Sequence, residues 1–432
     1  MKIAVIGTGI SGMAVSYLLH PQHDITVYEQ SDYIGGHSRT RTVQHDGQTI
    51  AVDTGFIVFN ARNYPHLCAL FKHLDIPTAS SNMSFGVSID NGWLEYGTNQ
   101  LLGLLAQKKN LCRPKFYRLL ADILRFNRQA KRYVEKNPQA SMAQCLTDLR
   151  LSNWFRDYYL LAMGGAIWST PSTEMLAFPA KTLIQFFDNH GLLTVNDQPQ
   201  WHTVLGGSQT YIKKLTASFS HRIRLNTGVK RVKRLPDGVA VIDCLDQTEH
   251  YDQVIFACHS DQALAMIAQP TAAETSVLGR IRYQPNQAVL HTDARLMPHH
   301  QSAWSSWVYL SRSQTNPQTN LQPTSPTHPA NGVSLTYWMN NLQPLGTAKP
   351  LFVTLNPAEP PDARLIYDTH TFHHPLFDAD AIAAQQALAS IQGTDKLWFC
   401  GAWQRYGFHE DGLLSAVNLA RQFGVTPPWE AL

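Results

Sequence analysis

A group of reactive and stacking side chains lies near the end of the sequence, in the stretch CGAWQRYGFHEDGLL. Trp403, Tyr406 and His409 stand there just before two carboxylates and Gly412. Imidazole is the side chain that most readily gains and loses a proton near neutral pH. We therefore take His409 as the candidate catalytic acid or base, and Tyr406 and Trp403 as candidates to line a bound ring.

The surrounding residues predict the elements that must position this group. KLWFCGAW is typical of a strand that runs into a glycine turn, and HEDGLLSAVNLARQF is typical of an amphipathic helix. Gly412 falls in the first turn of that helix, where free N–H groups and the positive end of the helix dipole lie.

A second chemical motif stands at the other end of the chain. KIAVIGTGISGMAVSYLLH predicts a buried strand, a GxGxxG turn and a helix, and DITVYEQ predicts a second strand that ends at an acid. This is the full context of a dinucleotide-binding motif, in which glycines approach a pyrophosphate and the acid holds a ribose. The residues expected to bind the dinucleotide, NAD or FAD, are Gly7, Gly9, Ile10, Ser11, Gly12, Glu29 and Gln30.

The next stretch, EQSDYIGGHSRT, adds a second glycine pair and a cation just after the acid. It resembles the extension found in the FAD-binding flavoprotein amine oxidase superfamily, which includes monoamine oxidases, protoporphyrinogen oxidase and phytoene desaturases. AVDTGFIVF resembles the superfamily's next element, although a simple turn at Asp53–Gly55 is the alternative interpretation. The resemblance implies FAD contacts at Gly35, Gly36, His37, Arg39, Thr40, Thr54, Gly55 and Phe56.

Later segments resemble the superfamily in the expected order. RLNTGVKRVKRLPDGVAVI predicts two strands joined by a Pro-Asp-Gly turn, and YDQVIFACHSDQALAM predicts a buried strand followed by a helix. The resemblance implies that the last strand, turn and helix support the isoalloxazine ring. It also implies noncovalent FAD, because no Cys stands at the position that binds flavin covalently in monoamine oxidases. The contacts implied here are Val229, Ala257, Gly401, Asp411, Gly412 and Leu413.

The order of these motifs predicts the domain organisation. We expect an α/β protein with a discontinuous Rossmann-like FAD-binding domain built from 1–85, 196–270 and 391–425. A mixed α+β substrate domain of the amine oxidase type would come from 86–195 and 271–390. The 432 residues exceed what one ordinary core holds, which agrees with two domains.

Several stretches outside the cofactor motifs narrow the resemblance. GFIVFNARNYPHLCALFKHLDI, NMSFGVSID and GFHEDGL are similar to the flavin-binding N-terminal part of plant cyclopropane fatty acid synthases. They also resemble stand-alone bacterial proteins described as predicted NAD/FAD-binding proteins. The resemblance implies a flavoenzyme of unsaturated or methylated acyl chains. It also implies an acyl-chain methyltransferase as a partner.

The segment 107–136 is strongly basic. It contains ten Lys and Arg residues against two acids, and large apolar residues are interleaved with them. A basic amphipathic helix of this kind can lie on an anionic membrane surface. The alternative is a helix of the substrate domain with one face in the core and a solvated cationic face.

Composition excludes several other classes of protein. The net charge is only +3, and nothing in the sequence indicates nucleic-acid binding. The six Cys residues are far apart and form no CxxC pair, so we expect free thiols and no metal site. We expect no signal peptide and no transmembrane helix. The chain is therefore expected in the cytoplasm, with peripheral contact at the inner membrane surface.

The function that we expect is FAD-dependent oxidation, desaturation or isomerisation of a phospholipid-linked unsaturated acyl chain. Two alternatives stay open. One is a flavin amine oxidase that acts on a small amine with oxygen. The other is a flavin-binding protein without redox activity that anchors an acyl-chain methyltransferase.

Overall fold

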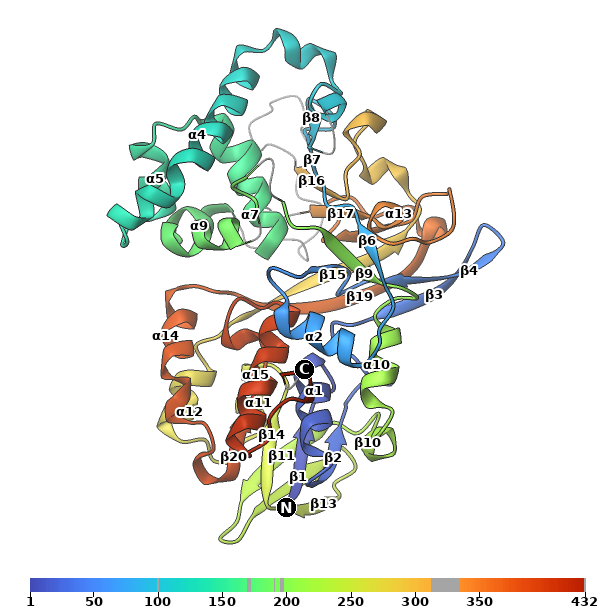
Figure 1. Ribbon diagram of the computed structural model, residues 1–432, viewed down its shortest axis with the longest axis vertical. Helices are drawn as coiled ribbons and strands as arrows, with labels where there is room; N and C mark the ends of the chain where they lie inside the picture. The colour runs from blue at the N-terminus through green and yellow to red at the C-terminus, as the bar shows by residue number, and fades with distance from the viewer. Residues whose placement is uncertain (99–100, 169–171, 190, 195–197, 312–333, 431–432) are drawn as a thin grey trace.

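The computed structural model describes residues 1–98, 101–168, 172–189, 191–194, 198–311 and 334–430. Two bodies lie one above the other along the long axis, and both chain ends lie in the lower body (Figure 1). The lower body holds a parallel sheet with helices on its faces. The upper body holds a mixed sheet beside a group of helices.

The lower sheet collects strands from distant parts of the chain. Its order is β10-β2-β1-β14-β20, and every pair in it is parallel. The first residues of the chain provide the central strand, in which Val5 pairs with Val27 on one side and Ile255 on the other. The strands are Lys2–Ile6 (β1), Asp24–Tyr28 (β2), Ile223–Arg224 (β10), Gln253–Phe256 (β14) and Leu397–Phe399 (β20).

Helices cover one face of this sheet. The helices α1 (Ile10–Leu19) and α15 (His409–Gln422) pack in one hydrophobic cluster with β1 and β2, and Met13, Leu413 and Val417 are buried in it. The expected strand–glycine turn–helix unit at each end of the chain is therefore present. The two units lie side by side because both pack on the same sheet.

A second cluster covers the other face. It joins β1 and β14 to the antiparallel sheet β11-β12-β13 and to three helices. Two of these helices, α12 and α14, come from 271–390, the range that the sequence assigns to the substrate domain. Their residues Val277 and Ala384 pack in the same cluster as Ala4 and Phe256. The elements are Val229–Arg234 (β11), Val239–Asp243 (β12), Thr248–Tyr251 (β13), Ser260–Met266 (α11), Ala272–Leu278 (α12) and Ala379–Ala387 (α14).

The upper sheet has the order β19-β15-β18-β17-β16-β7-β8. All of its pairs are antiparallel except β7 with β16. The strands are Phe85–Ile89 (β7), Leu94–Gly97 (β8), Tyr283–His291 (β15), Trp307–Ser311 (β16), Ser334–Trp338 (β17), Phe352–Leu355 (β18) and Ile366–Pro375 (β19). The architecture confirms the predicted α/β fold with a discontinuous nucleotide-binding part and a mixed second part.

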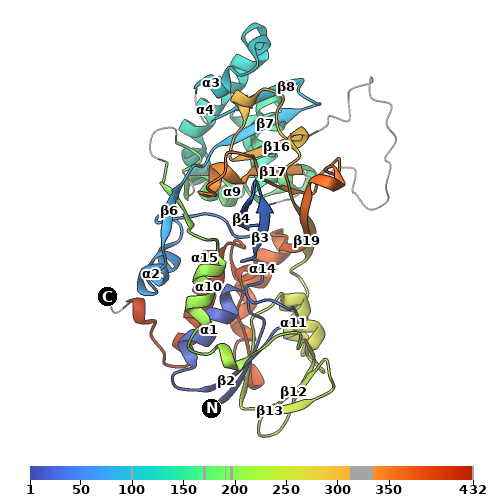
Figure 2. The same ribbon diagram turned by 90° about the vertical axis from the view of Figure 1, so that its right-hand side faces the viewer.

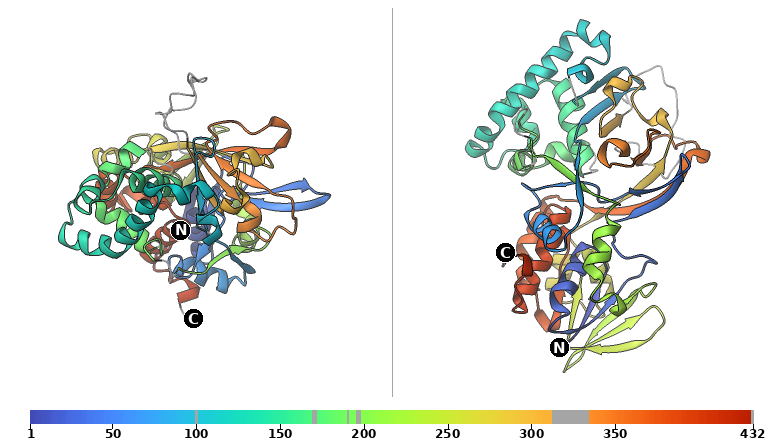
Figure 3. Two further views of the ribbon diagram at one scale, coloured as in Figure 1. Left: turned by 90° about the horizontal axis from the view of Figure 1, so that it is seen from above. Right: turned by 45° about the vertical axis from the view of Figure 1, so that its right-hand side comes forward.

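Helices pack beside the upper sheet in the largest hydrophobic cluster. The long helix α4 (Pro114–Lys136) buries Phe116, Leu119 and Phe126 there and leaves most of its cations exposed. In Figure 3 it lies at the end of the molecule opposite both termini. The shorter helices nearby are Leu101–Leu104 (α3), Met142–Asp148 (α5), Leu161–Trp168 (α7) and Ala180–Asn189 (α9). None of the helices in the described ranges is long and apolar enough to cross a membrane.

Two long strands connect the bodies. The antiparallel pair β15 and β19 runs between them, as Figure 2 shows for β19. At their lower end Tyr283 pairs with Pro375, and the Tyr283 hydroxyl accepts a hydrogen bond from Ser260 N at 2.9 Å, at the start of α11. The start of α11 in the lower body therefore contacts the strand pair β15 and β19 of the upper sheet.

Candidate flavin site

The first glycine loop is closely packed on one side and open on the other. A Cβ atom on Gly12 would lie 1.9 Å from the Gly7 carbonyl oxygen, and one on Gly7, where φ is +105°, would lie 2.8 Å from the Ala257 carbonyl oxygen. A Cβ on Gly9 would meet no atom within 4 Å. Gly9 is the N-cap of α1, where no side chain caps the free N–H groups. The loop thus leaves open backbone at a helix N-terminus, which suits a phosphate.

The other glycine loops come to the same place. A Cβ on Gly36, where φ is +58°, would lie 3.1 Å from the Cα of Gly9. A Cβ on Gly412 would lie 2.8 Å from Ile10 Cγ2, and the Ser11 hydroxyl donates to the Gly412 carbonyl oxygen at 2.9 Å. The three segments that sequence analysis singled out therefore converge around the start of α1.

Glu29 ends β2 and is 8% exposed. Its Oε2 accepts hydrogen bonds from Thr8 N at 2.9 Å and the Thr8 hydroxyl at 2.5 Å, and its Oε1 accepts from Ser31 N at 2.9 Å. A carboxylate has about four acceptor positions, so about one stays available for a ribose hydroxyl. Gln30 is exposed and packs against Gly228, the residue before β11 and Val229.

Arg39 and Thr40 hold protein elements together. The Arg39 guanidinium forms a bidentate ion pair with Asp368 of β19, at 2.5 and 3.2 Å, and donates to the Thr54 hydroxyl at 3.3 Å. The Thr40 hydroxyl donates to Asp53 at 2.6 Å. The sequence did not indicate these protein partners, because Asp368 lies more than 300 positions from Arg39.

Asp53 is a buried junction between distant segments. Besides Thr40, it accepts hydrogen bonds from the backbone and hydroxyl of Ser208 and from Gln343 Nε2 at 2.8 Å. Burial raises the pKa of Asp53 to about 6, and these four donors oppose the shift. The residue joins β4 (Gln48–Asp53) to the Gly206–Gly207 turn and to the upper body, so the simple-turn interpretation understates its role.

Imidazoles gather beside the second glycine pair. His37 stacks on Phe372 with ring centroids 4.9 Å apart, and the ring centroid of His374 lies 5.4 Å from that of His37. His259 stacks on Tyr283 at 4.3 Å. Burial lowers the pKa of His259 and of His374 to about 4 and holds the pKa of His37 well below its ordinary value. These imidazoles are neutral at pH 7. Of them, sequence analysis named only His37 as a site residue.

His409 is held by three other segments. Its ring stacks on Phe56 with centroids 3.9 Å apart, and its Nε2 lies 2.8 Å from the Tyr211 hydroxyl and 3.0 Å from Ser38 Oγ. Burial lowers the pKa of His409 to about 3, so the imidazole is neutral. Burial also raises the pKa of the Tyr211 hydroxyl, which therefore keeps its proton. The sequence did not indicate Tyr211 or Ser38 as site residues, although Ser38 lies within the GGHSRT stretch, because their contact with His409 joins distant segments.

The two aromatic candidates have different surroundings. Trp403 is 3% exposed and lies in the cluster with Phe256 and Phe399, where its Nε1 donates to the Cys258 carbonyl oxygen at 3.1 Å. Tyr406 is half-buried, and the Arg405 guanidinium lies over its ring. The structure therefore gives Trp403 a packing role in the core. Ring contact by Trp403 or Tyr406 stays a prediction.

The two acids of the α15 turn cap helices. Asp411 accepts hydrogen bonds from Tyr406 N and Phe408 N and closes the N-terminus of α15. Glu410 accepts from His66 N at 2.9 Å and Leu67 N at 3.0 Å, at the N-terminus of α2 (Pro65–His73). Burial raises the pKa of Glu410 to about 7. Gly401 N donates to Ser415 Oγ at 2.9 Å, which ties the preceding turn to the same helix.

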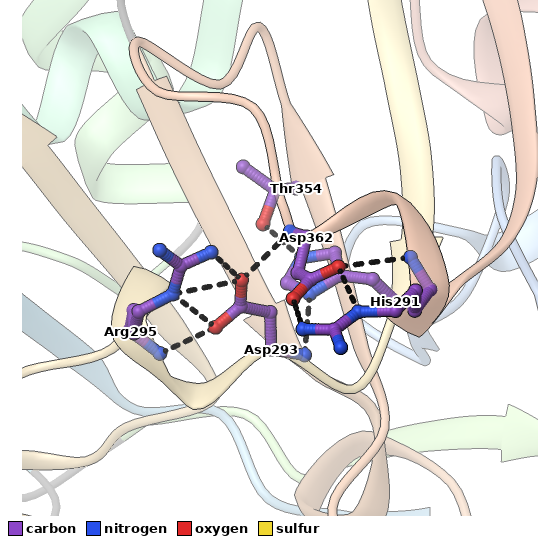
Figure 4. A network of polar contacts seen from close by, with 6 residues as sticks. His291, Asp293, Arg295, Thr354 and Asp362 are labelled. Carbon is purple, nitrogen blue, oxygen red and sulfur yellow. Dashed lines mark hydrogen bonds and ion pairs between the residues drawn. The ribbon is translucent and has the colours of Figure 1, made fainter.

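A separate polar network lies in the upper sheet (Figure 4). His291 of β15 accepts a hydrogen bond from Asp293 N at Nδ1, so its Nε2 carries the proton and donates to Thr354 Oγ1 at 2.7 Å. Asp293 pairs with Arg295 and accepts from Asp362 N. Burial lowers the pKa of His291 to about 4. The carboxylates, the imidazole and the threonine hydroxyl drawn all have local partners, and we interpret the network as structural.

These observations fit FAD. The open backbone at Gly9 suits a diphosphate, the remaining acceptor position of Glu29 suits a ribose hydroxyl, and Gly36 and Gly412 flank the same loop. No cluster of three or more possible metal ligands is present among the described residues. Scattered segments thus form a site whose residues fit a dinucleotide.

Comparisons with known proteins agree with this geometry. A model of the family "Flavin containing amine oxidoreductase" matches residues 10–356. A Mycobacterium tuberculosis protein named "Putative flavin-containing monoamine oxidase AofH" is 26% identical over 266 residues, which cover 58% of this chain and 55% of that protein. The chain thus spans about half the length of the curated relatives it matches.

Solved structures share the fold over nearly the whole chain. A fatty acid isomerase from P. acnes that produces CLA has a TM-score of 0.64 at 14% identity, with 98% of each chain covered. A putrescine oxidase bound to putrescine has a TM-score of 0.65 at 14% identity, with 98% of this chain and 99% of that chain covered. At these identities the likeness supports the fold alone. Because the family model spans most of the sequence, the chain belongs to the flavin-containing amine oxidoreductase family.

Proposed function

We propose that this flavoenzyme binds FAD noncovalently and oxidises, desaturates or isomerises an acyl chain of a membrane lipid. One observation carries the choice of substrate. Half of the exposed large hydrophobic side chains among the described residues lie in 102–124, at the far end of the upper body; they are Leu102, Leu105, Leu111, Tyr117 and Leu124. Clustered exposed apolar side chains mark an interaction surface.

Cations surround these apolar side chains. Lys108, Lys109, Lys115 and Arg118 are exposed in the same segment, whereas Asp122 is fully buried and pairs with Arg118 and Arg125. Exposed leucines beside lysines suit the interface of an anionic bilayer. The buried face of α4 agrees with the second sequence interpretation of 107–136, a helix with one face in the core. Membrane contact by its exposed face is part of this proposal. One face packs in the core, and the other offers a surface for peripheral membrane contact.

When bound, the flavin supplies the redox chemistry by accepting a hydride. The chain's part is to bind, orient and exclude water. Gly9 and the start of α1 would hold the diphosphate, and Glu29 would hold a ribose. His409 is neutral, and its imidazole is positioned by Phe56 and Tyr211. It is the candidate to hold or move a proton at Nε2.

The junction beside His409 is apolar. Phe408, the residue before it, stacks on Phe186 of α9 with ring centroids 5.3 Å apart. This contact joins the α15 turn to the helices of the upper body. The stacked rings place apolar surface beside His409, which would suit an acyl chain.

An amine substrate is the second candidate. The named function of the M. tuberculosis relative favours it. A redox-inactive complex with an acyl-chain methyltransferase is the third and rests on the sequence resemblance.

Anaerobic titration of the FAD-loaded protein separates these candidates. We expect the visible flavin band to bleach with an unsaturated phospholipid in neutral detergent micelles. Bleaching with amines alone would favour an amine oxidase. If neither bleaches the band, product analysis of the lipid distinguishes isomerisation, which leaves the flavin oxidised at the end, from a role without chemistry.

A further inference from the structure

A groove with two lysines in its lining lies beside the exposed leucines. It has a volume of about 500 Å³ and is bounded by the turn before β8, the segment between α3 and α4, and the loop after β15. The residues that line it are Gly92, Ala106, Gln107, Lys108, Lys109, His299 and His300. Nothing in the cofactor site uses these residues.

The groove has a positive rim and an inward-facing acid. Lys108 and Lys109 are exposed. The acid nearest to the histidines, Glu95, is fully buried and accepts hydrogen bonds from His300 Nδ1 at 2.6 Å and from the backbone N–H of His299 and His300. These donors therefore pair the Glu95 carboxylate. Both lysine side chains are exposed, and Lys109 Nζ also donates to the Gly92 carbonyl oxygen at 3.5 Å.

Buried amides fix the backbone of the groove. Gln107 is 2% exposed, and its Nε2 donates to the Gly92 carbonyl oxygen at 2.6 Å while its Oε1 accepts from Glu95 N at 3.3 Å. Asn110 Nδ2 donates to the Glu95 carbonyl oxygen at 3.0 Å. The segment that carries both lysines is thus anchored to the strand below it.

Apolar side chains stand on both sides of the lysines in the chain. Leu102 is 70% exposed, Leu105 is 36% exposed and Leu111 is 46% exposed. A ligand that satisfies both features must carry an anionic group next to apolar chains. A glycerophospholipid has this chemistry, since its phosphate lies directly above its acyl chains.

We propose that the groove binds the phosphate of an anionic phospholipid while Leu102, Leu105 and Leu111 enter the acyl layer. The choice of a lipid rests on the proposed function. The proposal adds the class of headgroup and a docking site that is separate from the cofactor site. Lysine ammonium groups act as point charges on phosphate. Each basic residue at an anionic surface contributes about 1 kcal/mol of attraction.

The test is sedimentation of the FAD-loaded, full-length protein with vesicles. Vesicles of phosphatidylcholine alone are compared with vesicles that also contain phosphatidylglycerol. We expect binding only to the second kind, and weaker binding as salt is added. Lys108→Gln with Lys109→Gln should lower the affinity about tenfold to thirtyfold. The matched control is Lys213→Gln with Lys233→Gln, at two exposed positions of the lower body. It should bind the vesicles as the wild type does.

A second pair of variants tests the apolar part. Leu102→Ser with Leu111→Ser should weaken vesicle binding, whereas Leu245→Ser, a change at a 67% exposed leucine of the lower body, should not. Equal binding to both kinds of vesicle, or no loss in the lysine variant, would overturn the proposal. Binding of inorganic phosphate that is lost in the lysine variant, without any binding to vesicles, would also overturn it. That outcome would identify a free anion as the ligand.

Different outcomes would contradict the docking site and the proposed function. Flavin bleaching and product formation in neutral micelles need no anionic headgroup. Substrate turnover in micelles without vesicle binding would therefore remove the docking site and keep the acyl-chain chemistry. Vesicle binding without turnover would do the reverse.

Discussion

The imidazole of His409 lies almost parallel to the phenyl ring of Phe56, with 3.9 Å between the ring centroids and 10° between the planes. One ring begins α15 and the other follows β4, so the stack joins two segments more than 300 positions apart. The Tyr211 hydroxyl of α10 (Gln209–Thr216) then fixes Nε2 at 2.8 Å. The orientation of His409 is set by the protein before any substrate is present.

This arrangement makes Tyr211→Phe informative. The change removes the hydroxyl next to His409 Nε2 and keeps the ring. If His409 moves a proton during the reaction, we expect the rate of anaerobic flavin reduction by substrate to fall about tenfold to hundredfold. The pH dependence of that rate should also shift. Stopped-flow absorbance in the flavin band measures both.

Tyr17→Phe is the matched control for this experiment. It breaks a hydrogen bond of the same type, between the Tyr17 hydroxyl and His73 Nε2 at 2.9 Å, near the C-terminal end of α1. It should leave the rate unchanged. An unchanged rate and pH profile in Tyr211→Phe, together with an unchanged rate in His409→Ala, would show that His409 has no acid or base role.

The glycine loop predicts opposite outcomes at two neighbouring positions. Gly9→Ala adds a methyl group that meets no protein atom within 4 Å, so the cofactor-free protein should unfold at the same temperature as the wild type. The methyl would occupy the space for the diphosphate, and we expect FAD affinity to fall at least about tenfold, which is about 1.4 kcal/mol. Calorimetry and flavin fluorescence measure the two quantities.

Gly12→Ala should instead damage the fold. Its Cβ would lie 1.9 Å from the Gly7 carbonyl oxygen, inside the contact between α1 and the loop. We expect about 1 to 3 kcal/mol of destabilisation in the absence of cofactor, the usual range for overpacking. Equal stability of the two variants, or normal FAD affinity in Gly9→Ala, would contradict the assigned role of the loop.

Sequence reasoning recovered what depends on local pattern. The strand–glycine–helix units at Gly7 and at Gly412 follow from apolar runs and glycine spacing, and both are present as expected. The residues that position His409 were not recoverable, because Tyr211 and Ser38 belong to segments whose contact is created only by the tertiary fold. Arg39 illustrates the same limit, since its charge is paired with Asp368 from a distant strand.

The domain division shows a related effect. Composition does not separate α12 and α14 from the strands around them. They pack on the lower sheet because Val277, Leu278 and Ala381 complete a cluster with β14 and β20. The boundaries 1–85, 196–270 and 391–425 for one domain, and 86–195 and 271–390 for the other, stay predictions.

The buried imidazoles predict an acid-sensitive protein. The pKa values of His259, His291 and His374 are lowered to about 4, and that of His409 to about 3, from 6.5. Between pH 6.5 and 4 the unfolded chain therefore binds more protons than the folded one, and stability falls as the pH falls. Asp53, Glu410 and Asp411, whose pKa values burial raises, act in the opposite direction but are outnumbered.

Urea denaturation at several pH values measures this slope. Each buried imidazole contributes up to about 1.4 kcal/mol per pH unit. His374→Phe should make the slope shallower by up to that amount, whereas His221→Phe, at an exposed position, should leave it unchanged. Stability that is constant from about pH 6.5 down to about pH 4.5 would contradict the neutral state of the cluster.

Glu410 predicts a pH effect of the opposite sign. Burial raises its pKa from 4.5 to about 7, so the folded state binds more protons than the unfolded state between these values. The stability that wild-type Glu410 contributes is therefore lost as the pH rises through about 7. Glu410→Gln removes this titration and keeps a carbonyl oxygen that can accept one of the two N–H groups at the start of α2.

We expect the free energy of unfolding of Glu410→Gln, relative to the wild type, to increase by about 1 to 3 kcal/mol from about pH 5 to about pH 8. Glu135→Gln is the control, since it removes an exposed carboxylate of α4. Its effect should depend little on pH. A pH-independent difference for Glu410→Gln would mean that the carboxylate stays ionised, because the two backbone donors and the dipole of α2 outweigh the cost of burial.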